Sequence, residues 1–267
     1  MNNASFFAFS HPKAGSTLLD SLLTDASDMA GFEVVNLPGK GYENGIDPRF
    51  FTRSIDQVLC PNGCAYLGWR FFPGETDFDF SQSRAVYLVR DPRDMMVSLF
   101  FSFAQSHVVP AKGQARDHML AARKATQSAE PAEWAQRKRS YAPYLKQIGE
   151  YRHKLVLSRT RIYRYEDVIF RKREWLEDMA GFLELDLPTE ELALIADRHD
   201  IRPDREDPTA HVRQVKPGNH RRHLTREAIE HLNREFGEIL EFYGYSQAVE
   251  ENPAICFQPE RRATPSS

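Results

Sequence analysis

The sequence predicts an α/β domain in which a central parallel sheet is flanked by helices on both faces. Short, continuous apolar runs, the first at Phe6–Phe9, alternate with longer segments whose apolar residues recur at helical spacing. Each of the first three runs leads into a turn rich in Pro, Gly or Asp, a pattern typical of buried parallel strands. The 267 residues suit one domain, which we place at residues 1–251, ahead of a polar tail at 252–267.

The strands are expected where the apolar runs are shortest and most continuous. After Phe6–Phe9 come Ala65–Trp69, stopped by Pro and Gly, and Ala85–Val89, stopped by Asp91-Pro92. The runs Leu155–Leu157 and Ile162–Tyr163 predict a further strand or a strand pair.

Helices are expected between and after these strands. We predict one from Ser16 onward, one after Asp91-Pro92, one that buries Trp175–Leu183, and a last one capped by Thr225 and ended by Gly244. The charged, Ala-rich stretch 112–148 is also expected to be helical, with a break at residues 130–131.

Composition sets few limits on function. The net charge of −3 means that any anion site has to come from a local cluster of basic residues. Three cysteines, Cys60, Cys64 and Cys256, suit a reducing compartment better than a disulfide framework, and we interpret Cys60 and Cys64 as loop cysteines, not metal ligands. The N-terminus has neither a basic region nor a long apolar run, so we expect a soluble, cytoplasmic protein with no membrane span.

The first chemical signal is the segment His11-Pro-Lys-Ala-Gly-Ser-Thr17, between the first strand and the first helix. Backbone N–H groups at a helix start converge on one point and favour an anion there. Gly15 permits close backbone approach, and Lys13 adds a positive charge. A Walker A loop has its Lys after the second Gly, whereas here the Lys precedes the Gly. An ordinary turn followed by a Ser/Thr helix cap is the alternative interpretation.

The second signal is Arg90-Asp-Pro-Arg-Asp94 after the third strand, with Ser98 on the following helix. An Arg at the end of a strand and a Ser eight residues later can converge on one group of phosphate oxygens. Taken alone, the segment also reads as a helix start with surface arginines.

Together, these segments resemble the PAPS-dependent sulfotransferases, where PAPS is 3′-phosphoadenosine-5′-phosphosulfate and PAP its desulfated product. The family's Pro-Lys-x-Gly-Thr-Thr loop, which binds the 5′-phosphosulfate, is similar to residues 12–17, and so implies donor binding by Lys13, Ala14, Gly15, Ser16 and Thr17. Leu18 stands where the family often has an adenine-stacking Trp. The family's Arg-x-Pro-x-Asp-x-x-x-Ser element places Arg90 and Ser98 at the 3′-phosphate. The resemblance implies a P-loop NTPase-like sheet within a single domain.

Two weaker segments extend the resemblance. Tyr165-Glu-Asp is similar to the family's Tyr-Glu-Asp segment, which implies that Tyr165 contacts the adenine. Residues 211–218 resemble the C-terminal Arg-x-Gly-x-x-Gly segment, which implies that Arg213 and Gly218 close over the nucleotide. Val215 replaces the first Gly, and His220 stands where Trp is common.

The chemistry implied is transfer of a sulfuryl group from PAPS to a hydroxyl or amine, with no metal required. We expect Lys13 to neutralise the bridging oxygen as sulfur leaves. The family's usual catalytic His after the second strand is absent, since that stretch is Gly68–Pro73, in which Arg70 is a candidate contact of the sulfuryl group. His107 is our choice for the proton acceptor, with other candidates in His11, Glu43 and Asp47.

Two other functions stay open from the sequence: a P-loop kinase or other NTPase, and a non-catalytic PAP(S)-binding protein of the same fold. The order of Lys13 and Gly15 and the Arg90/Ser98 pair, which suits a ribose phosphate that ATP lacks, count against the kinase. The expected partner is a small-molecule or glycan acceptor, not a nucleic acid polymer, and we expect residues 39–53 and 112–148 to shape its pocket. The acceptor's identity and the oligomeric state stay open.

Overall fold

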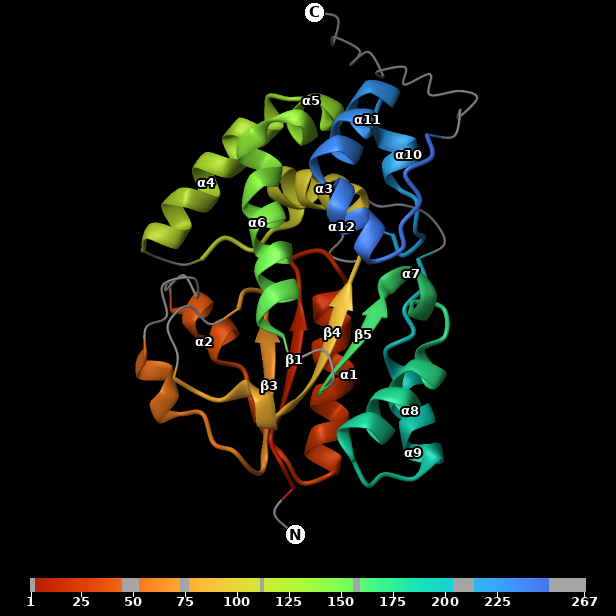
Figure 1. Ribbon diagram of the computed structural model, residues 1–267. Helices are drawn as coiled ribbons and strands as arrows, with labels where there is room; N and C mark the ends of the chain where they lie inside the picture. The colour runs from red at the N-terminus through yellow and green to blue at the C-terminus, as the bar shows by residue number, and fades with distance from the viewer. Residues whose placement is uncertain are drawn as a thin grey trace, which may run out of the picture.

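The computed structural model describes residues 3–44, 53–72, 77–110, 113–155, 159–203 and 214–249. Within these ranges, five strands form one parallel sheet in the order β2-β3-β1-β4-β5 (Figure 1). The strands span Glu33–Val35 (β2), Cys64–Trp69 (β3), Phe6–Ser10 (β1), Arg84–Val89 (β4) and Thr160–Arg164 (β5). The predicted α/β class with a central parallel sheet is therefore confirmed.

The helices alternate with the strands and continue beyond them. Their bounds are Ser16–Met29 (α1), Leu37–Glu43 (α2), Pro92–Phe101 (α3), Gln114–Gln127 (α4), Pro131–Gln136 (α5), Lys138–Lys154 (α6), Tyr165–Val168 (α7), Lys172–Leu183 (α8), Thr189–Arg198 (α9), His220–His223 (α10), Arg226–Glu235 (α11) and Gly237–Phe242 (α12). Figure 1 shows α3, α5 and α10–α12 gathered beyond the tips of the strand arrows, the end of the sheet at which a site is expected.

The alternation of side chains along each strand divides the core into two layers. On β1, Phe7 and Phe9 point into one layer, and Phe6 and Ala8 into the other. Helices α1, α8 and α9 bury their apolar faces in the layer that contains Phe6. Helices α3, α5, α6, α11 and α12 cover the layer that contains Phe7. All five residues of β1 are buried, as expected for a central strand covered on both faces.

Several predicted elements differ in detail from the structure. The prediction of a single last helix was wrong, because α11 ends at Glu235 and α12 begins at Gly237. The prediction that the side chain of Thr225 caps the first of these helices is confirmed. Leu155 follows α6 and does not begin a strand, while residues 156–158 lie outside the described ranges. The stretch 112–148 is broken at residue 130 as predicted, and α3 runs into a π-helical turn at Ser102–Ser106.

No helix in the described ranges is long and apolar enough to cross a membrane. The predicted tail at 252–267 lies outside the described residues.

The two-layer core predicts a large loss of stability when α1 is truncated at Leu22, which is completely buried. Leu22→Ala removes apolar contacts and leaves a cavity, so we expect the free energy of unfolding to fall by about 2–5 kcal/mol in urea titrations. Leu194→Ala on α9 is the matched control, because Leu194 is 60% exposed and surface truncations cost about 0.5 kcal/mol or less. Equal effects for the two variants would contradict the packing of α1 on the sheet.

Candidate nucleotide-binding site

The loop between β1 and α1 turns sharply where an anion site was predicted. In this loop, the backbone N–H of Ala14 donates to the carbonyl of His11 at 3.1 Å, and α1 then begins at Ser16. Gly15 occupies the N-cap position and brings no side chain with which to cap the helix. The first turn of an α-helix has N–H groups without intrahelical acceptors, and the helix dipole favours negative charge there.

Position 15 requires glycine for two independent reasons. Its φ of +96° lies in the left-handed region, and a Cβ atom there would come within 2.8 Å of Tyr165 Cδ2. The same Cβ would lie 3.2 Å from Leu88 Cδ2. The loop therefore lies directly against the side chain of Tyr165, at the start of α7.

Arg90, immediately after β4, joins this loop to the rest of the site. Its Nη1 donates to the carbonyl oxygen of Lys13 at 3.0 Å, and its guanidinium lies 4.5 Å from the centre of the Tyr165 ring. Its Nη2 lies 3.6 Å from Asp94 Oδ2. Burial lowers the pKa of Arg90, but the surrounding acidic groups, Asp94 first among them, together outweigh it. The pKa is raised, so the group stays charged.

Asp94 was not predicted as a site residue, and it is completely buried. Oδ2 accepts from the backbone N–H of Gly218 at 2.8 Å, and Oδ1 accepts from the N–H of His220 at 2.8 Å and its Nδ1 at 2.6 Å. Burial raises the pKa of Asp94, but the hydrogen bonds from His220 and the charge of Arg90 prevail and hold it well below its usual range.

The segment around Gly218 is held by Tyr165 and by α3 as well as by Asp94. The hydroxyl of Tyr165 donates to the carbonyl of Val215 at 3.0 Å, and α10 packs on α3. Ser98 lies one turn after Asp94 on α3, half-buried, so the two side chains share one helix face. The predicted residues Gly15, Arg90, Tyr165 and Gly218 therefore belong to one connected group of contacts, whereas Arg213 lies outside the described residues.

Arg70, a sequence candidate, lies at the carboxyl end of β3, next to α1. Its Nη2 pairs with Asp20 Oδ2 at 2.7 Å, and Asp20 Oδ1 accepts the backbone N–H of Gly68 at 3.0 Å. Asp20 follows Thr17 by three residues, so this pair holds the Arg70 guanidinium near the first turn of α1.

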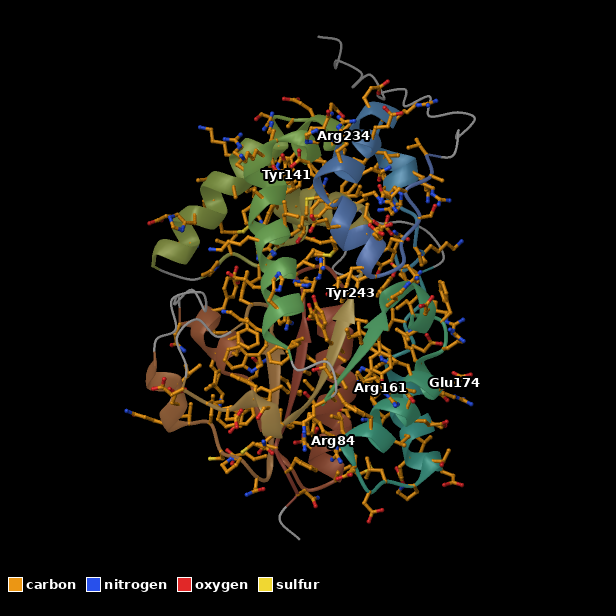
Figure 2. The ribbon with its side chains drawn as sticks, in the orientation of Figure 1. Arg84, Tyr141, Arg161, Glu174, Arg234 and Tyr243 are labelled. Carbon is orange, nitrogen blue, oxygen red and sulfur yellow. The ribbon has the colours of Figure 1, made fainter. Side chains whose placement is uncertain are left out.

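His11 lies beneath the loop in an aromatic environment. It is 1% exposed, and burial lowers its pKa to about 3, so its ring is neutral. Its Nε2 is hydrogen-bonded to the Tyr87 hydroxyl, and its ring packs edge-on against Tyr151 at 5.0 Å. Tyr87 in turn contacts Tyr243, which Figure 2 shows above the sheet, at the end of α12. These contacts give His11 a packing role beneath the loop.

His107 lies in a different group of contacts, between α2 and α4. Its ring packs edge-on against Tyr42 at 6.1 Å, and its Nδ1 lies 3.3 Å from the hydroxyl of Ser102. Its carbonyl accepts from Arg123 at 2.6 Å. Glu43, the carboxylate candidate that the structure describes, is exposed at the end of α2, while Asp47 lies outside the described residues.

In the described part of the chain, no three His, Cys, Asp or Glu side chains are grouped so that they could hold a metal ion. Cys60 is exposed and Cys64 is buried, and both are free thiols.

Known proteins share the fold of this chain, and one family model matches its sequence. Solved structures that share the fold include a mouse sulfotransferase complexed with PAP (TM-score 0.53, 15% identity, 91% of this chain and 86% of that one) and a retinol dehydratase complexed with retinol and PAP (TM-score 0.51, 15% identity, 90% and 82%). No curated protein matches the chain. Residues 75–244, more than half of the sequence, match the model of the sulfotransferase domain. The chain therefore belongs to the sulfotransferase domain family.

Proposed function

We propose that this protein transfers a sulfuryl group from PAPS to a hydroxyl or amine of a small-molecule or glycan acceptor, and releases PAP. The observation that carries the proposal is the position of Arg90, which contacts the phosphate loop through Lys13 on one side and the Asp94 cluster on the other. An arginine that lies between the phosphate loop and α3, the helix that carries Ser98, suits a nucleotide with phosphates on both the 5′ and the 3′ positions.

The 5′-phosphosulfate is assigned to the phosphate loop and the first turn of α1. Backbone amides from Ala14 to Thr17 would hold its phosphate oxygens, since a helix N-terminus favours an anion. The first turn of α1 contains no acidic residue to compete for those amides. Lys13 has a left-handed backbone conformation in this turn, with a φ of +67°.

The 3′-phosphate is assigned to Arg90 and Ser98, with Arg213 as a third ligand. Arg90 is held by contacts that leave its Nε without a hydrogen-bond partner among the described residues. Tyr165, whose face lies against Arg90, is assigned to the adenine side of the nucleotide, and Gly218 to the segment that covers it. Support for a small-molecule acceptor comes from the retinol dehydratase structure, which contains retinol together with PAP.

In the reaction, the acceptor oxygen or nitrogen forms a bond to sulfur while the bond from sulfur to the bridging phosphate oxygen breaks. Negative charge therefore grows on that oxygen, and Lys13 is assigned to neutralise it. Arg70, held near the first turn of α1 by Asp20, is a further candidate contact of the sulfuryl oxygens.

The acceptor loses a proton as its bond to sulfur forms, and His107 is the proposed proton acceptor. It is half-buried, whereas His11 is enclosed by aromatic rings and Glu43 is exposed.

The proposal is tested first by calorimetry with PAP, ATP and GTP, followed by a labelled-donor assay against a panel of hydroxyl and amine acceptors. Binding of PAP in preference to ATP, with label transferred to an acceptor, is expected. Preference for ATP would favour the kinase class. Tight PAP binding without transfer to any acceptor would indicate a non-catalytic binding protein.

Lys13→Met is expected to reduce kcat by about a hundredfold or more, as for removal of one preorganised donor to developing charge. PAP affinity should fall much less, because the backbone amides still hold the ground-state charge. Met has the same backbone preference as Lys, so the positive φ at residue 13 adds no new strain. Lys154→Met, at an exposed position at the end of α6, is the control. Normal turnover of Lys13→Met would make the loop a structural turn.

Ser98→Ala is expected to weaken PAP selectively. A hydrogen bond to a charged phosphate contributes about 1.5–3 kcal/mol, so the Kd for PAP should rise about tenfold or more in calorimetry. Adenosine 5′-phosphosulfate, which lacks the 3′-phosphate, should bind with nearly unchanged affinity. Arg90→Ala should weaken both nucleotides, because Arg90 also holds the Lys13 carbonyl. Equal losses of both ligands in Ser98→Ala would contradict the 3′-phosphate assignment.

His107→Gln is expected to lower kcat by about a hundredfold or more, the usual effect of losing a general base, with the Kd for PAP unchanged. His153→Gln is the matched control, since His153 is exposed on α6. An unchanged kcat in His107→Gln would move the proton acceptor to one of the other candidates, Glu43 or Asp47.

A further inference from the structure

The carboxylate of Asp94 accepts three hydrogen bonds from one segment that is distant in the sequence. Gly218 and His220 provide two backbone N–H groups and one imidazole N–H, from residues more than 120 positions away in the sequence. Both partners are enclosed, with Asp94 completely buried and His220 4% exposed. A buried carboxylate needs such hydrogen-bond partners, because leaving its charge unpaired would destabilise the folded state by several kcal/mol, on the order of 3–5 kcal/mol.

The bond between the two side chains fixes the tautomer of His220. An ionised carboxylate only accepts hydrogen bonds, so Nδ1 of His220 carries the hydrogen that it donates to Asp94 Oδ1 at 2.6 Å. The same oxygen accepts the backbone N–H of His220 at 2.8 Å. Two bonds to one oxygen thereby fix both the backbone and the ring of His220 at the start of α10.

Asp94 also lies beside the arginine assigned to the 3′-phosphate. Arg90 Nη2 lies 3.6 Å from Asp94 Oδ2, the oxygen that accepts from Gly218. The carboxylate therefore connects the covering segment to Arg90 directly. Val215 of the same segment is held by Tyr165, whose ring lies against Arg90.

We propose that Asp94 and His220 act as positioning residues for the donor nucleotide: their hydrogen bonds hold residues 215–223 against α3 and thereby orient Arg90 toward the 3′-phosphate. This inference rests on the proposed function. It assigns a role to His220, at a position where the family commonly has a Trp that lacks this pair of ring nitrogens.

One variant, Asp94→Asn, separates positioning from simple electrostatics. Asp94→Asn removes a negative charge next to Arg90, so electrostatics alone predicts tighter binding of PAP. An amide, however, has one acceptor oxygen and one NH₂ group, which would face an N–H donor of the covering segment. Positioning therefore predicts weaker binding. We expect the Kd for PAP to rise about tenfold, with a smaller change for adenosine 5′-phosphosulfate.

Two further variants, both at His220, keep Asp94 in place, since a change at a buried carboxylate can unfold the chain. His220→Phe keeps an aromatic ring and removes the donor, so the Kd for PAP should again rise about tenfold. His220→Asn places an amide N–H close to the position of Nδ1 and should restore most of the affinity. The effects of Asp94→Asn and His220→Phe should be less than additive in the double variant, because both break one contact.

Hydrogen exchange of the backbone amides of residues 218 and 220 in the ligand-free protein tests the contact independently of nucleotide binding. Protection of these amides from exchange should fall in Asp94→Asn and His220→Phe and return in His220→Asn. Tighter PAP binding by Asp94→Asn, unchanged protection in His220→Phe, or lost protection with unchanged PAP affinity would each overturn the inference. A wild-type chain that binds no PAP would overturn the proposed function and the nucleotide role together, even if the exchange data support the contact itself.

Discussion

The site depends on one guanidinium, that of Arg90, which contacts three segments that are far apart in the sequence. It bonds the carbonyl of Lys13, lies against the ring of Tyr165 and pairs with Asp94. Burying a charged group is costly unless its partners satisfy it, so these contacts constrain one another. The parallel pairing of β1 with β4 makes the arrangement possible, because it brings the ends of both strands, and thus Lys13 and Arg90, to the same edge of the sheet.

The acidic groups near this arginine are themselves engaged. Asp91 caps α3 and pairs with Arg93 through both oxygens. Glu166 accepts from the backbone N–H of Asp91 and from the hydroxyl of Tyr245, and burial raises its pKa. These acids therefore serve to connect α3, α7 and the C-terminal segment. A chain with a net negative charge can in this way keep a basic group available at the end of its sheet.

The central strands and the turn between β1 and α1 could be predicted from the sequence, because both are encoded in consecutive residues. Phe6–Phe9 is a continuous apolar run, and Gly15 is required by local backbone geometry. The edge strand Glu33–Val35 was missed because it is short and begins with an exposed residue. The contact between Asp94 and His220 could not be predicted, since it joins distant residues and depends on how α10 packs against α3. The break before Gly237 was missed because the apolar spacing continues through it.

The close approach of Gly15 to Tyr165 also limits how this sequence can change over time. A side chain at position 15 has no room while the Tyr ring is present, and a smaller residue at 165 would remove the ring that lies against Arg90 and the hydroxyl that holds Val215. Neither position can therefore change first without cost. The backbone conformation of Gly15 constrains that position even without the Tyr ring, so both residues are expected to be retained even where the surrounding sequence diverges.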